Sequence, residues 1–279
     1  MFTQQPAQLS TDTNDFVNKY KQMSEQIEFH EDTHTYVNKI TGNIYRPVSD
    51  VKTECGYGEQ ADKLPEEAQK LGDFTAKIGT EIHAAFSAML LNKFKQSDYP
   101  NLSKSTINSI NNIITKLRKK YQIISSEQIL FNDALNIAGT ADLIVKDKAT
   151  GKIILLDFKT KVRNIGSTKK SGFSYYHSSK FGKPDFDKHN FQLTMYEQLH
   201  NMLGLKIDER GIIPIEYDAT EDGKVEKLYY TSKSDGTTLE EKGYFTIPHR
   251  TYIDNDIDKL VINNENAEDL SNTNLTEQI

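Results

Sequence analysis

Residues 136–160 read NIAGTADLIVKDKATGKIILLDFKT, two β-prone runs on either side of the turn Lys148-Ala149-Thr150-Gly151. We expect the two runs to pair as a β-hairpin, because a short turn that contains glycine joins them. The apolar run at 153–156 is typical of a strand that is buried on both faces. This segment therefore predicts the centre of a β-sheet.

Helical and strand periodicities alternate around this hairpin. Apolar residues at mostly four-residue steps predict helices over residues 65–94, 104–121 and 188–203. β-prone runs predict strands at 123–131, 211–217 and 225–230, and the turn Thr41-Gly42-Asn43 predicts a hairpin within residues 29–49. We expect residues 15–253 to form one α/β domain with a central mixed β-sheet flanked by helices.

The two ends of the chain differ from this domain in composition. Residues 1–14 and 254–279 are polar and poor in aromatic residues, and the second segment is acidic and rich in asparagine. Such segments bury too little apolar surface to fold on their own. We expect a flexible N-terminal segment and an acidic C-terminal tail, in which Ile257, Leu260, Val261 and Ile262 could form one short helical turn.

The charge balance and the single cysteine exclude several classes of protein. The chain has 34 Lys and Arg against 40 Asp and Glu, a net charge of −6, which argues against a protein coated with basic charge for nucleic acid. One cysteine excludes a zinc site or iron–sulfur cluster built from four cysteines of this chain. No run of about 18 apolar residues and no secretory leader is recognisable, so we expect a cytoplasmic protein with no membrane partner.

Two carboxylates and a lysine lie close together on the predicted hairpin. Asp142 and Asp157 are on its two strands, and Lys159 follows Asp157 by two residues. Side chains alternate along a strand, so Asp157 and Lys159 project from one face. Charges at the end of a buried strand need partners, and a metal ion bridging the two carboxylates would supply one. An ion pair between Asp157 and Lys159 is the alternative explanation.

Five further polar side chains belong to predicted helices and strands outside the Asp157–Lys159 segment. Glu81 and His83 are embedded in an apolar helix, Gln192 and Tyr196 share one face of a later helix, and Glu127 is on the strand before Asp142. His83 could approach a carboxylate cluster as a metal ligand. Each residue also has an explanation that involves no function. His83 could be a core histidine with its hydrogen bonds satisfied, Gln192 and Tyr196 could be ordinary helix residues, and Glu127 could be a solvated strand residue.

The long connection after Lys159 has a strong charge bias. Residues 161–183 contain no Asp or Glu, and their aromatic residues are interleaved with basic ones. A basic, aromatic loop suits phosphate contact and base stacking, so we expect it to bind DNA; a solvated surface loop is the alternative. The predicted DNA-binding residues are Lys161, Arg163, Lys169, Lys170, Tyr175, Tyr176, Lys180 and Lys183.

Four short motifs follow one another in a recognisable order. GTEIH (79–83), GTADLIV (139–145), LLDFKT (155–160) and QLTMY (192–196) together resemble the RecB-like and phage exonuclease branch of the PD-(D/E)xK nuclease superfamily. The upstream stretch HTYVNKITGNIYRPVSDV (34–51) is similar to the lead-in of these nuclease domains. It departs from the family pattern at residues 47–50, which read Pro-Val-Ser-Asp where Ser-Val-Thr is usual.

The resemblance implies a restriction-endonuclease-like core and a Mg²⁺- or Mn²⁺-dependent deoxyribonuclease. That enzyme, an exonuclease by this resemblance, would hydrolyse phosphodiester bonds in DNA recombination, repair or replication of a phage type. DNA and a separate recombination or replication protein are the implied partners, and a phage-encoded enzyme would work in the host cell cytoplasm. Because the chain has a single cysteine, it cannot belong to those relatives that bind an iron–sulfur cluster through four cysteines.

The resemblance also implies a role for each motif residue. Asp142, Asp157, the Phe158 carbonyl and His83 would bind the metal, and Lys159 would orient or deprotonate the attacking water and steady the phosphate. Gln192 and Tyr196 would contact the DNA backbone and support Lys159, and Glu127 and Glu81 would have supporting roles. The alternative is a nuclease-derived, non-catalytic DNA-binding or virion-assembly protein, against which the intact acidic and lysine positions argue.

Overall fold

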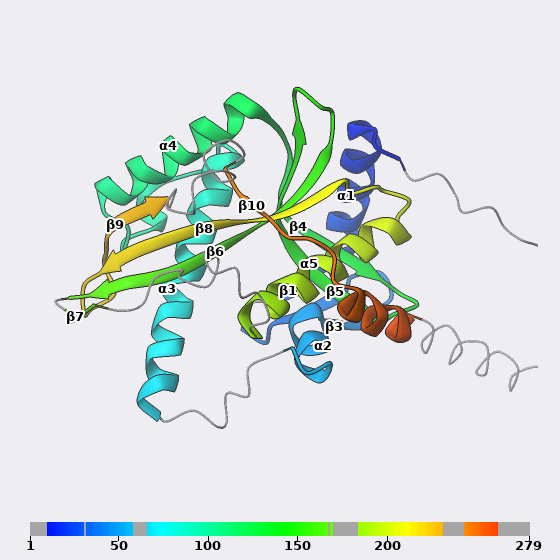
Figure 1. Ribbon diagram of the computed structural model, residues 1–279, viewed down its shortest axis with the longest axis horizontal. Helices are drawn as coiled ribbons and strands as arrows, with labels where there is room; N and C mark the ends of the chain where they lie inside the picture. The colour runs from blue at the N-terminus through cyan, green and yellow to red at the C-terminus, as the bar shows by residue number, and fades with distance from the viewer. Residues whose placement is uncertain are drawn as a thin grey trace, which may run out of the picture.

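The chain folds around one large β-sheet with helices on both of its faces (Figure 1). The computed structural model describes residues 10–30, 32–57, 66–166, 168–169, 184–230 and 243–261. The helices are α1 (Thr13–Gln26), α2 (Val48–Glu54), α3 (Glu66–Leu90), α4 (Lys104–Lys120) and α5 (Pro184–Met202), with a 3-10 turn η2 (Gln96–Asp98) and a further helix at 251–261. The strands are β1 (Ile27–His30), β2 (Thr35–Asn38), β3 (Ile44–Pro47), β4 (Tyr121–Asn132), β5 (Ile137–Asp147), β6 (Ile153–Ile165), β7 (Thr168–Lys169), β8 (Glu209–Ala219), β9 (Val225–Tyr230) and β10 (Phe245–Thr246).

The sheet mixes parallel and antiparallel pairs. Its main path runs β1-β2-β3-β5-β6-β8-β10, with β4 paired to β5, β7 to β6 and β9 to β8. β4, β5 and β6 are antiparallel neighbours, whereas β3 lies parallel to β5 and β8 lies parallel to β6. The expected fold class, an α/β core with a central mixed sheet flanked by helices, is confirmed.

Alternation along the central strands divides the core between the two faces of the sheet. Leu143 and Leu156 belong to the cluster that α3 and α4 cover, and Ile144 and Leu155 to the cluster that α1 and α5 cover. Both strands are therefore apolar on both faces, as expected for the middle of a covered sheet. Figure 1 shows α4 beside β9 and α1 toward the opposite end of the molecule.

The sheet opens into a fork between its two central strands. β5 and β6 pair until Leu143 lies opposite Leu156, and their pairing ends there. Beyond this point β6 stays beside β8, whereas the earlier part of β5 pairs with β3. The next residue on each side of the fork is a carboxylate, Asp142 on β5 and Asp157 on β6. The topology therefore places the two predicted metal-binding aspartates side by side.

Both expected end segments contribute residues to ordered helices. α1 begins at Thr13, where the side chain of Asp12 accepts a hydrogen bond from the Asn14 backbone amide and caps the helix. Residues 251–261 are helical, and Ile253 and Ile257 are fully buried in the core. The ordered fold therefore continues past the expected boundary at residue 253, because these isoleucines one helical turn apart pack against the core. Within the described ranges, no helix is both long and apolar enough to cross a membrane.

Candidate metal centre

Asp142 and Asp157 are held nearly out of solvent at the fork. Their residues are 9% and 2% exposed, respectively. The backbone amide of Phe158 donates a hydrogen bond to Asp142 Oδ2 at 2.7 Å, across the gap where the two strands separate. The ring of Phe158 packs on the other face of the sheet against Phe86, with centroids 4.7 Å apart. This packing fixes the strand that carries Asp157.

Helix α5 holds the Asp-x-Lys strand through two of its polar side chains. Lys159 Nζ lies 2.7 Å from Asp157 Oδ2 and 3.5 Å from Gln192 Oε1, to which it donates. Gln192 Nε2 donates to Asp157 Oδ1 at 3.3 Å and to the Tyr196 hydroxyl at 3.5 Å. The four residues that the motifs single out on β6 and α5 therefore form one connected network.

The glycines of two motifs allow this close assembly. A Cβ atom at Gly139 would lie 2.7 Å from Cε1 of Tyr196, so glycine is what lets α5 approach β5. A Cβ atom at Gly79 would lie 2.7 Å from the hydroxyl oxygen of Thr160, the residue after Lys159. The sequence thus brings α3 and α5 against the two sides of the fork by removing side chains at the contact points.

A histidine and two carboxylates converge on the fork with the spacing of metal ligands. His83, Glu127 and Asp142 each offer one donor atom, and these atoms lie within 4.8 Å of one another. His83 comes from α3, and the β4–β5 pairs on either side place Glu127 opposite Asp142. Glu127 has a φ of 52°, a strained conformation for this residue type that is concentrated at functional sites. The donor set of one imidazole nitrogen and two carboxylate oxygens suits a divalent metal ion.

Burial shifts the pKa values of these groups in the direction that favours their neutral forms. Burial raises the pKa of Asp157 to about 6, with the charge of Asp142 adding to it and that of Lys159 opposing it. Desolvation raises the pKa of Glu127 to about 8, although the residue is open to solvent at one side, and the charges of Asp142 and Asp157 raise it further. Burial lowers the pKa of His83 to about 4, so its imidazole is neutral. A bound cation would stabilise the charged forms of the two carboxylates, and the neutral imidazole keeps a lone pair for it, so the residues present fit a divalent metal.

Comparison with known proteins adds little to this geometry. No family model matches the chain, and no curated protein matches it significantly. Among solved structures, the chain is similar to a "putative exonuclease" from Eubacterium rectale with a TM-score of 0.33 and 14% sequence identity, over 80% of this chain and 82% of that one. A similarity at this level is too distant to assign a function.

Glu81 is not part of the cluster. Its two carboxylate oxygens accept hydrogen bonds from the backbone amide of Asn101 at 3.1 Å and from the Asn101 side chain at 2.8 Å. This corrects the expectation that Glu81 supports the site: its carboxylate anchors the segment before α4. Two positions along a helix correspond to about 200°, so Glu81 and His83 cannot face the same way.

Only two of the predicted DNA-binding side chains can be placed. Lys161 follows Lys159 by two residues on β6, and it is half-buried. Arg163 lies 3.7 Å from Glu216 and covers the ring of Tyr229 at 4.1 Å, so packing within the fold engages it. The backbone of Lys169 belongs to β7, whereas its side chain lies outside the described residues, as do Lys170, Tyr175, Tyr176, Lys180 and Lys183.

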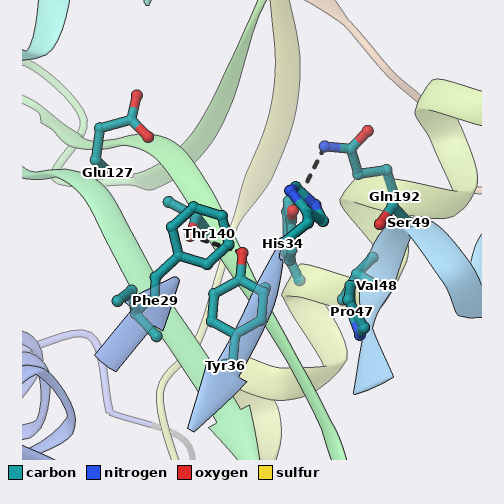
Figure 2. A pocket seen from close by; sticks show the side chains of 12 residues that line it. Phe29, His34, Tyr36, Pro47, Val48, Ser49, Glu127, Thr140 and Gln192 are labelled. Carbon is teal, nitrogen blue, oxygen red and sulfur yellow. Dashed lines mark hydrogen bonds between the residues drawn. The ribbon is translucent and has the colours of Figure 1, made fainter. Parts of the chain in front are cut away.

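A cavity of about 450 Å³ opens beside the carboxylates, and its walls were not anticipated from the sequence. We call it the aromatic pocket; Figure 2 shows Phe29, Tyr36 and His34 lying between Glu127 and Gln192. Thr140 and Ser49 also line it, and Tyr196 closes the side toward α5. The signal that could have found it is the pairing of aromatic residues within the predicted 29–49 hairpin.

Proposed function

We propose that the chain is a divalent-metal-dependent DNA nuclease, and by its motif order an exonuclease of the RecB-like and phage type. The observation that carries this proposal is the fork, where Asp142 and Asp157 meet beside Lys159 and the His83–Glu127 pair. Two carboxylates buried where the strands separate do not stabilise the fold, because buried charge costs free energy unless it is compensated. We infer Mg²⁺ or Mn²⁺ as cofactor and DNA recombination, repair or replication as the setting.

The metal would be held by His83, Glu127 and Asp142, with Asp157 and the Phe158 carbonyl as the further oxygens that the family resemblance implies. When bound, a divalent ion supplies Lewis acidity that activates water and neutralises charge on the phosphate. Asp142 is preset for this task, because the Phe158 amide fixes the orientation of its carboxylate. His83 is neutral and so has a free lone pair available for a cation.

We infer that Lys159 contacts the phosphate and does not remove a proton. Burial works against its ammonium form, but the carboxylates of Asp157 and Asp142 outweigh burial and raise the pKa of Lys159. Nζ therefore stays protonated and can donate a charge-assisted hydrogen bond to a phosphate oxygen. Gln192 limits the positions that Nζ can take, because its amide contacts both Lys159 and Asp157.

Cleavage of DNA tests this proposal directly. Purified protein is incubated with 5′- and 3′-labelled linear duplex, single strands and nicked and closed circles, in Mg²⁺ or Mn²⁺ and with an EDTA control. We expect metal-dependent degradation of linear DNA that Lys159→Ala abolishes. The matched control is Lys206→Ala, because Lys206 also lies 2.7 Å from an aspartate, Asp208, but away from the fork. DNA binding without cleavage in either metal would favour a non-catalytic DNA-binding protein instead.

A further inference from the structure

The metal centre lies at the boundary between two cavities that differ in chemistry. The aromatic pocket lies on one side, and a second cavity of about 510 Å³ is lined by α3 residues on the other. Phe29 and Glu127 line both cavities, whereas His83 belongs to the second and Gln192 to the first. A nucleic acid strand whose phosphate lay at the carboxylates would have both cavities within reach.

The two cavities differ in their charged groups. The second cavity has Lys93 and Ser87 in its wall, which can contact a phosphate. The lining of the aromatic pocket, as far as the described residues show, contains no lysine or arginine, and the carboxylate of Glu127 lines both cavities. Lys93 is therefore what distinguishes the two linings: among its described lining residues the aromatic pocket offers a phosphate no lysine or arginine to pair with, whereas an uncharged base needs none.

The walls of the aromatic pocket suit the flat face and polar edge of a base. Phe29 and Tyr36 lie opposite each other on β1 and β2 with ring centroids 4.7 Å apart, and His34 meets Phe29 edge-on at 5.3 Å. Tyr36 is buried and supports Phe29, which is half-buried and therefore offers a ring face to the cavity. The Tyr36 hydroxyl, 3.0 Å from the Thr140 hydroxyl, can also bond a base edge.

We propose that the aromatic pocket takes the unpaired base of the nucleotide next to the scissile phosphate, with Phe29 as the stacking residue. The inference rests on the proposed nuclease function and adds its substrate class: single-stranded DNA or a frayed end. A cavity of about 450 Å³ is within the size range of small-ligand sites, so it admits one base that has left the duplex stack. A terminal phosphate is the competing occupant.

The test replaces one base at a time. Single-stranded oligonucleotides with an abasic site at successive positions are cleaved in Mn²⁺, and the products are mapped by length. We expect the bond beside the abasic site to be cleaved about 5- to 150-fold more slowly, the range of base–aromatic stacking. Phe29→Leu should cleave all bonds at similar rates, whereas Phe74→Leu, which alters a half-buried ring on α3 outside both cavities, should keep the wild-type pattern.

A second readout separates this inference from the nuclease activity. An oligonucleotide that carries the fluorescent base 2-aminopurine should be quenched on binding to the Lys159→Ala protein, and Phe29→Leu in that background should remove the quenching. Equal quenching in both proteins, or an abasic penalty that persists in Phe29→Leu, would overturn the inference. A cleavage pattern that depends on a 5′-phosphate and not on the base would also overturn it. If no DNA is cleaved at all, the proposed function fails, and the quenching alone decides the occupant.

Discussion

Replacing Gly139 with alanine should disturb the site through one atom. The added Cβ would lie 2.7 Å from Cε1 of Tyr196 and 2.9 Å from Cγ2 of Val48. Packed carbon atoms stay about 3.5–4.0 Å apart, so the ring and the valine must each retreat by roughly 1 Å. Overpacking of this kind costs about 1–3 kcal/mol, or about 2–12 °C in Tm for a chain of this size. Since Tyr196 contacts Gln192, a shift of roughly 1 Å at the site should slow cleavage by up to about 100-fold.

The matched control is Gly72→Ala on α3. A Cβ at Gly72 meets nothing within 4 Å, so this change should leave cleavage intact and stabilise the helix by up to about 1 kcal/mol. Both variants are compared by urea unfolding and by single-turnover cleavage of labelled DNA. Wild-type stability and wild-type rate in Gly139→Ala would refute the reasoning that this glycine sets the distance between β5 and α5.

Three other changes test separate parts of the account. Burial lowers the pKa of His200 from 6.5 to about 4, so on acidification the unfolded chain takes up a proton before the folded protein does, and the free energy of unfolding decreases as the pH is lowered. In urea melts, wild type should lose about 2 kcal/mol more of this free energy than His200→Gln between pH 7.5 and pH 5. Equal losses would contradict this expectation. Glu81→Ala should lower the free energy of unfolding by about 1–3 kcal/mol, because the hydrogen bonds to Asn101 are lost, and should leave the cleavage rate unchanged. A slower cleavage rate would indicate that Glu81 does support the site. Mn²⁺ at 100 times its Kd should raise the free energy of unfolding of wild type by about 2.7 kcal/mol and that of Asp142→Asn far less. An equal thermal shift in both proteins would show that Asp142 holds no metal.

The long periodic elements of this fold could be predicted from the sequence. The helices expected at 65–94, 104–121 and 188–203 correspond to α3, α4 and α5, because each carries several turns of apolar residues. The strand assignments at the centre of the sheet also hold, since alternation or a continuous apolar run marks them. The fork could be anticipated only in part: period two places Asp157 and Lys159 on one face, but the point where β5 and β6 separate is set by β3 and β8.

The parts that could not be predicted depend on tertiary contacts. α1, α2 and β1 are short or polar, and only packing against the sheet makes their few apolar side chains informative. The burial of Ile253 and Ile257 is not visible in a segment that is acidic and rich in asparagine. The aromatic pocket requires Phe29 from the first hairpin to meet Glu127 from β4, almost 100 positions later in the chain, which no local pattern reports.

If Asp142 and Asp157 hold the metal that cleaves DNA, Asp157→Asn should remove the activity. This change keeps the shape of the side chain and removes the charge that Lys159 and Gln192 surround. The matched control is Asp208→Asn, which alters the equivalent pair with Lys206. We expect the single-turnover rate in Mn²⁺ to fall by at least about 1000-fold in Asp157→Asn, an effect of about 4 kcal/mol, and to stay at the wild-type value in Asp208→Asn. Metal-dependent cleavage at the wild-type rate by folded Asp157→Asn protein would contradict it.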